Sequence, residues 1–226
     1  MSDDDLPGVS PKRRAILEGA AALFMAEGFG AVSMDAVART AGVSKATLYA
    51  YFSGKDALFA EIIRGNCRRM QAAAPPSFSS HDLPLDRALV EFGEHWLNFL
   101  LQPQVRALHR MVIAECGRIP ELARAFYEAG PLAVRAWVAG WLAEEVLRGR
   151  LRPGTDPDLA AEQFLSLLRG DLFLRATLGL EPQANPEAVS ALARQAAAGF
   201  LAIYAAIRPL ASERMDSSEN LHRHES

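Results

Sequence analysis

Hydroxyl, phenol and ammonium groups are concentrated in one short stretch of this sequence, residues 33–58, SMDAVARTAGVSKATLYAYFSGKDAL. Groups of these kinds at helix starts suit the oxygens of a phosphate backbone. The stretch contains, in this order, a short helix, a glycine turn, a second short helix and the start of a third helix. This order of parts predicts a helix-turn-helix, whose second helix can enter the major groove of DNA.

Capping residues and a glycine position the two short helices. Ser33 and Ser44 each precede a helix, where a side-chain hydroxyl accepts a hydrogen bond from an otherwise unpaired N–H. Gly42 lies where the chain must turn, because glycine adopts a positive φ without steric cost. The third helix is expected to start with a capping box made by Ser53 and Asp56.

The second short helix, expected from Lys45 to about Phe52, has two distinct faces. Leu48 and Phe52 are four residues apart and face inward, whereas Lys45, Thr47 and Tyr51 face solvent. The exposed face therefore carries polar groups that are available to a partner.

The pattern A-G-V-S-x-x-x-L-Y-x-Y-F-x-x-K-x-x-L over residues 41–58 resembles the DNA-binding domain of TetR-family transcriptional regulators. The preceding helix also matches that family, with an apolar stripe at Ile16, Ala20, Leu23 and Phe24. The resemblance covers residues 11 to about 70. It implies sequence-specific binding to double-stranded DNA, with a helical hairpin that has no DNA role as the alternative.

The resemblance also implies roles for individual side chains. Ser33, Ser44, Tyr51 and Lys55 occupy positions that resemble phosphate contacts. A second group lies near the start of the reading helix and can reach base edges: Lys45, Ala46, Thr47 and Tyr49. Lys45 suits guanine, and Ala46 or the Thr47 methyl suits the thymine methyl, while Tyr49 can instead pack between helices.

Charge is distributed in keeping with this assignment. The whole chain of 226 residues has a net charge of −3, so it is not a general polyanion binder. Residues 10–70 hold nine Lys and Arg against five Asp and Glu, which leaves the excess of acid in the remainder. A basic end on an acidic body is typical of one DNA-facing domain.

The sequence carries no recognisable catalytic set. GxSxG, P-loop, GxGxxG and HExxH patterns are absent, so we expect neither an enzyme, nor a cofactor, nor a metal site. Cys67 and Cys116 form no CxxC pair, which suits free thiols in a reducing cytoplasm and leaves a redox role open. The N-terminus is acidic and is no signal peptide, and the longest apolar run is too short to span a bilayer.

The second half is helical by period, so we predict an all-α protein. A proline- and serine-rich linker at residues 74–84 precedes a long amphipathic helix, which Pro103 ends. A helical region over residues 121–149 is expected to bend at Gly130-Pro131. We predict a flexible arm (1–9), a helix-turn-helix domain (10–72), a helical ligand-binding and dimerisation domain (83–208) and a disordered tail (209–226).

The last two expected helices, residues 158–178 and 186–207, are apolar on more than one face. In the final helix a second stripe is made of small residues, Ala191, Ala198, Ala202 and Ala205. A helix that is apolar most of the way round needs burial on two sides. We therefore expect a homodimer through a four-helix bundle, with a monomer core as the alternative.

The second half also resembles, more loosely, the ligand-binding half of an AefR-like subset of the TetR family, through residues 106–115, 118–122, 126–127 and 130–131. Candidate pocket residues are Trp96, His109, Phe126, Trp137 and Arg175, because ligand pockets are mostly apolar with a few polar anchors. Each aromatic can equally be core, and Arg175 can pair with Asp171.

Together these observations predict a cytoplasmic, homodimeric regulator, typically a repressor, that binds inverted-repeat DNA and is released by a small molecule. An activator of the same fold, or a helical small-molecule binding protein with a vestigial DNA domain, is the alternative.

Overall fold

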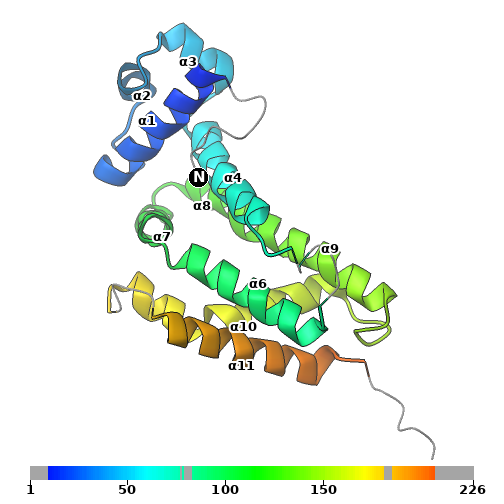
Figure 1. Cartoon of the computed structure of the whole chain (residues 1–226). Coiled ribbons are helices and arrows are strands. Elements are labelled where there is room, and N and C mark those ends of the chain that lie inside the picture. The colour runs from blue at the N-terminus through cyan, green and yellow to red at the C-terminus, as the bar shows by residue number, and fades with distance from the viewer. Residues whose placement is uncertain (1–9, 77, 79–82, 181–184, 207–226) are drawn as a thin grey trace, which may run out of the picture.

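The computed structural model describes residues 10–76, 78, 83–180 and 185–206. Within them the chain is helical, as predicted, and an isolated antiparallel bridge joins Leu151 to Ala205. Helices α1–α3 gather at one end of the molecule and α10 and α11 lie at the other (Figure 1). The helices are α1 (Pro11–Glu27), α2 (Met34–Thr40), α3 (Lys45–Tyr51), α4 (Lys55–Ala72), α6 (Leu85–Leu100), α7 (Pro103–Glu115), α8 (Pro120–Tyr127), the π-helix η2 (Glu128–Leu132), α9 (Ala133–Leu147), α10 (Pro157–Thr177) and α11 (Pro186–Tyr204).

The predicted local signals form the helix-turn-helix. Ser33 and Ser44 cap α2 and α3, accepting hydrogen bonds from the backbone N–H groups of Ala36 and Thr47. Gly42 turns the chain between them with a φ of 65°. The two short helices thus begin at the predicted residues because the caps satisfy their first N–H groups locally.

One predicted cap does not form. Ser53 and Asp56 were expected to make a capping box, but α4 begins one residue later than that box requires. Gly54 occupies the cap position, and no side chain caps the helix there.

Aromatic and aliphatic side chains hold α1 to α4. Phe24 and Phe29 lie against Phe59 of α4, with ring centroids 6.0 and 5.4 Å from the Phe59 ring. Leu48 and Phe52 are buried as predicted, so α3 docks through one face only. α4 also packs against α8 and η2, and it therefore belongs to the cores of both halves (Figure 1).

The expected bend at Gly130-Pro131 is a π-helical segment. α8 passes into η2, which contains Pro131, and the chain continues as α9. A proline lacks the N–H that the regular helical ladder needs, and a π-bulge is one way to accommodate it.

The last two helices differ from the prediction in two places. α10 is broken at Gly170, whose φ of 42° and ψ of −160° are not helical. α11 ends at Tyr204, because Ala205 is extended and bridges to Leu151. Ala205 is therefore not part of a helical stripe, and Ile207, expected to end that helix, lies outside the described residues.

The predicted linker is anchored by an aromatic side chain. Phe78 is buried and stacks on Phe92 and Trp141, with ring centroids 4.7 and 4.6 Å away. Trp137 contacts the same ring at 4.7 Å. A chain segment that reads as polar and proline-rich thus contributes a central residue of the second core.

The predicted arm and tail lie outside the described residues. Within the described ranges, no helix is long and apolar enough to cross a membrane.

Candidate nucleic-acid interface and ligand cavity

The exposed face of α3 carries the side chains predicted to read DNA. Lys45 and Ala46 are exposed, Thr47 is half-buried, and Tyr49 is 46% exposed. Because Tyr49 is not buried between helices, its side chain is accessible to a partner.

Lys45 is held on the surface by an ion pair with Asp35 of α2, Nζ to Oδ1 2.8 Å. The hydrogen bond to Asp35 and its charge raise the pKa of the Lys45 ammonium, so it stays charged at neutral pH. A base edge would have to compete with Asp35 for this ammonium. Because exposed ion pairs contribute little, that competition is easily won.

The serine caps leave their hydroxyl protons available. Ser33 Oγ accepts from the N–H of Ala36, and Ser44 Oγ accepts from the N–H of Thr47. A hydroxyl that accepts from the backbone can still donate its own proton. Ser33 can therefore donate to a phosphate oxygen without giving up its helix, and Ser44 can do so when the Thr47 hydroxyl, 2.8 Å away, is the donor in the bond between the two hydroxyls.

Tyr51 lies at the end of α3 and connects it to α1. Its phenol oxygen is 2.9 Å from Ser10 Oγ, the cap of α1. Tyr51 is 40% exposed, so the phenol lies at the surface beside the start of α1.

Lys55 has a structural environment that the sequence did not suggest. Its ammonium donates to the carbonyl oxygens of Phe29 at 2.6 Å, Val32 at 2.9 Å and Gly30 at 3.3 Å. It also lies 4.5 Å from the centre of the Phe29 ring. An ammonium has three N–H groups, so a direct phosphate contact would compete with these bonds.

Glu115 of α7 holds the same loop from the other side. Its carboxylate accepts from the N–H of Gly30, at 3.1 Å and 3.3 Å for the two oxygens. The α1–α2 loop is thus fixed through its carbonyls by α4 and through an N–H by α7. No spacing in the sequence indicates this contact between the two halves, because the partners are 85 residues apart.

In the second half, three of the five predicted pocket residues meet. Trp96, His109 and Phe126 line a cavity of about 50 Å³ together with Phe99, Cys67 and Arg169. The guanidinium of Arg169 lies 5.7 Å from the centre of the Trp96 ring. Sequence reasoning missed the contribution of Cys67, because α4 was read only as part of the DNA-binding domain.

The other two predicted pocket residues lie elsewhere. Trp137 packs into the cluster around Phe78 and Phe92. Arg175 is 3.5 Å from Asp171 in an exposed i,i+4 pair, the alternative considered for it. Neither is among the residues that line the cavity.

His109 is a half-buried ring that is neutral at neutral pH. Burial lowers its pKa, the hydrogen bond to the Val105 carbonyl opposes this, and the charge of Arg169 lowers the pKa further. Nδ1 is 2.8 Å from that carbonyl and must carry the proton, which leaves Nε2 as an acceptor. Burial also raises the pKa of the Cys67 thiol, which is therefore protonated at neutral pH.

Other buried polar groups serve the helix framework. His95 Nε2 donates to the Met70 carbonyl near the end of α4 at 2.7 Å. Arg106 donates to the Ala176 carbonyl at the end of α10 at 3.0 Å, where a positive charge complements the helix dipole. Glu145 is fully buried and accepts from Arg150 at 2.6 Å. The contacts of His95 and Arg106 join elements that are distant in sequence, whereas the Glu145–Arg150 pair is local, with partners five residues apart.

Two family models match the chain. Residues 16–62 match the model of bacterial regulatory proteins of the tetR family. Residues 87–206 match the C-terminal domain of AefR-like transcriptional repressors. Together they span both the helix-turn-helix and the helices that enclose the cavity.

Solved structures and sequence relatives agree with these matches. The flavonoid-responsive regulator FrrA is 40% identical, with a TM-score of 0.72 over 86% of this chain and 97% of its own. A TetR-family regulator from Mesorhizobium loti is 27% identical, with a TM-score of 0.73 over 86% of this chain and 96% of its own. The HTH-type transcriptional regulator YhgD of Bacillus subtilis is 27% identical over 85% of this chain and 94% of its own.

The two family matches, the exposed reading face of α3 and the helical second half lead to one assignment. The chain belongs to the TetR family of bacterial transcriptional regulators, with an AefR-like C-terminal domain.

Proposed function

We propose that this regulator is a homodimeric repressor that binds an inverted-repeat operator in the cytoplasm and leaves it when a small molecule binds the second half. The observation that carries the proposal is the single-sided docking of α3, which leaves Lys45, Ala46 and Tyr49 exposed as a set. A helix that docks on one face and presents polar groups on the other is suited to the major groove.

For the bases we propose Lys45, Ala46, Thr47 and Tyr49 as reading residues, and for phosphates Ser33, Ser44 and Tyr51. For Lys55 we propose a positioning role. Its bonds to the carbonyls of the α1–α2 loop support this, since they orient α2 against α4.

The test is a selection of bound duplexes from a random library. Two recognition helices related by a twofold axis should select inverted repeats with half-site centres about 34–36 Å or more apart. If the selected duplexes contain no palindromic motif, the proposed DNA recognition is wrong.

For dimerisation we propose the outer face of α10 and α11. Leu167 and Leu174 of α10 are exposed, as is Leu178 directly after it, and so are Ala202 and Ile203 of α11. Exposed apolar side chains on both of the last two helices are typical of an interface between copies.

Ala202→Arg tests this interface, because a long charged side chain would be buried without a partner if the two copies meet there. Sedimentation should then show monomers, and affinity for the operator should fall because the dimer is lost. Arg194→Ala on the same helix is the control. An undisturbed Ala202→Arg dimer would place the interface elsewhere.

The effector site we propose includes the cavity lined by Trp96, His109 and Phe126. Its apolar walls with few polar anchors support ligand binding. A ligand that favours the released geometry by about 1.4 kcal/mol would weaken DNA binding tenfold. The name of FrrA states a flavonoid response for that relative, which supports control of this chain by a small molecule.

A further inference from the structure

The cavity at Trp96 is too small to explain control by itself. It holds about 50 Å³, whereas ligand pockets usually hold roughly 300 Å³ or more. A larger groove of about 400 Å³ lies on the other side of α4, between α1, α4 and the start of α7. Nothing in the proposed DNA reading uses this groove.

The groove has apolar walls and a basic rim. Leu17, Phe59, Ile62 and Leu108 are among the apolar side chains that line it. Four arginines line it, from the start of α1 and from α4, against two glutamates: Arg13, Arg14, Arg68 and Arg69, and Glu18 and Glu61. An apolar trough edged with guanidinium groups is complementary to an amphiphilic anion.

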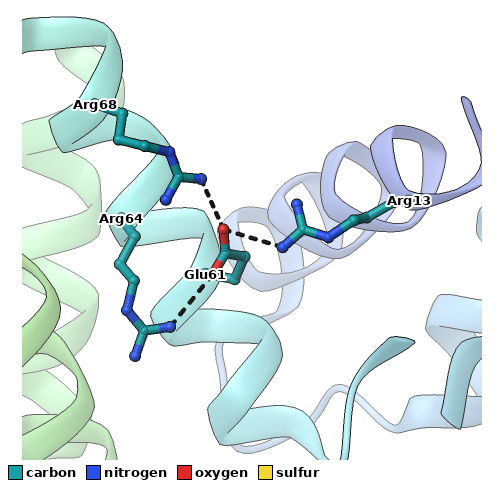
Figure 2. Close-up of polar contacts among 4 residues, drawn as sticks. All are labelled: Arg13, Glu61, Arg64 and Arg68. Atoms are coloured by element: carbon teal, nitrogen blue, oxygen red, sulfur yellow. Dashed lines mark hydrogen bonds and ion pairs between the residues drawn. The ribbon is translucent and has the colours of Figure 1, made fainter. Parts of the chain in front are cut away.

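One carboxylate is shared among several of these arginines. Glu61 Oε1 lies 2.7 Å from Arg68 and 3.0 Å from Arg13, and Oε2 lies 3.3 Å from Arg64 (Figure 2). Figure 2 shows Arg13 reaching across from α1 to Glu61 on α4. Three guanidinium groups around one carboxylate leave a net positive charge at this end of the groove.

Glu61 is ionised at neutral pH. Burial raises its pKa, but the hydrogen bonds and charges of Arg68 and Arg13 outweigh burial and hold the pKa below its ordinary value. The excess positive charge therefore persists, and a second anion is electrostatically favoured beside it.

The groove and the inner cavity share a wall. Asn66 and Leu108 line both spaces. Arg69 on the groove side donates to Asn66 Oδ1 at 2.5 Å, so the basic rim is bonded to that wall. Asn66 and Leu108 therefore lie where a ligand in the groove would pass on its way towards Trp96.

We propose that the effector is an amphiphilic monoanion whose acidic head is bound by Arg13 and Arg68 and whose apolar part passes Leu108 into the cavity at Trp96. The two spaces then act as one elongated site on both sides of α4. This assignment rests on the proposed ligand control and specifies the chemical class of the ligand.

The same geometry connects binding to DNA release. Arg13 belongs to α1 and Glu61 to α4, so their ion pair ties the two helices together. A bound carboxylate competes with Glu61 for both arginines. The position of α1, and of α2 and α3 packed on it, then depends on whether the head group is present.

Titration calorimetry with decanoate tests the head-group site. Decanoate should bind, whereas the neutral decanol and the cationic decyltrimethylammonium should not. Decyl phosphate then distinguishes a site for carboxylates from a site for anions in general. Arg68→Gln should weaken decanoate binding roughly tenfold, as expected for one charge-assisted hydrogen bond to an anion. Arg87→Gln, an exposed arginine of α6, is the matched control and should bind as the unaltered protein does.

Fluorescence quenching tests where the tail lies. An alkanoate with bromine at the far end of its chain should quench Trp96 strongly, and one with bromine beside the carboxylate should quench it weakly. Trp96→Phe should remove the difference. If that variant is unstable, comparison of the two bromine positions in the unaltered chain still decides the placement. Equal quenching by both probes would overturn the proposed path.

DNA binding separates this inference from the proposed function. If the chain binds its selected operator but decanoate and decyl phosphate neither bind nor release it, the anionic ligand class is wrong and the regulator assignment stands. If Arg68→Gln weakens operator binding without any ligand and lowers its salt dependence, the arginines serve DNA and the inference is overturned. If the chain selects no operator, the proposed function fails whatever decanoate does.

Discussion

The reading face of α3 and the framework of the second half use charged groups in opposite ways. Lys45 and Asp35 form an ion pair in which both side chains are more than half exposed. Glu145 is fully buried, and its partner Arg150 is three-quarters buried. Exposed charges contribute little to stability and remain available to a partner, whereas buried pairs are costly to break and unavailable.

Lys55 and the arginines around Glu61 lie between these extremes. Each is half-buried or exposed. Lys55 and Arg13 bond groups on another element, whereas Arg64 and Arg68 bond Glu61 within α4. The same side-chain types are therefore available to a partner, hold the fold or link the two halves, according to their burial and to the distance in sequence of their partners.

The largest effect is expected from breaking the buried pair. Arg150→Met leaves the Glu145 carboxylate buried without its partner, which typically costs about 3–5 kcal/mol. Urea unfolding should show this loss, while the folded fraction still binds DNA. Pairing it with Glu145→Leu should recover much of the stability. A single variant as stable as the unaltered protein would show that the pair is not buried in solution.

Lys55→Met should affect both stability and DNA binding. It removes the donors to the Phe29 and Val32 carbonyls, and leaving such groups unsatisfied costs about 1–3 kcal/mol. If Lys55 positions the loop, as proposed, and makes no phosphate contact, the salt slope of DNA binding should stay unchanged. A slope reduced by about one unit would instead establish the direct phosphate contact.

Lys45→Ala should affect DNA binding and leave stability almost unchanged, the opposite of what we expect for Arg150→Met. The free energy of unfolding should hardly change, since the pair with Asp35 is exposed. Operator affinity should fall, by about 1–3 kcal/mol if Lys45 reads a guanine, and the selected motif should relax at one position. A library selection with the variant checks the motif, and the same selection with Lys12→Ala on α1 is the control. An unchanged motif would remove Lys45 from the reading set.

The smallest effect is expected from His109. Its folded pKa is lowered by burial, so the folded state resists protonation that the unfolded chain accepts below about pH 6.5. Stability should therefore fall as pH drops from 6.5 towards the folded pKa, and nothing should change above pH 7. In His109→Phe the decline in Tm between pH 7 and pH 5.5 should be shallower. Parallel declines in the two proteins would show that His109 does not contribute.

The elements that the sequence determined are those whose signals are local. Ser33, Ser44 and Gly42 act on backbone groups within a few residues, so the bounds of α2 and α3 and the turn between them follow from spacing alone. The inward positions Leu48 and Phe52 follow from the helical period in the same way.

The tertiary structure decided the partners of side chains that act over long distances in sequence. Lys55 meets carbonyls 23 to 26 residues away, and Glu115 meets Gly30 from 85 residues away. Phe78, in a stretch that reads as linker, is buried because three other rings surround it. The periodicity of the sequence indicates which face of a helix is apolar, but only the packed structure shows which residues cover that face.

The same limit explains the ligand site. Trp96, His109 and Phe126 were predicted from their chemistry, and they share one cavity because α6, α7 and α8 converge there. Trp137 and Arg175 have the same chemistry but lie on faces turned to other neighbours. The sequence indicates which residue types can line a pocket. Which of them meet depends on how the helices cross, and the helices cross so as to bury the apolar surface of the whole chain.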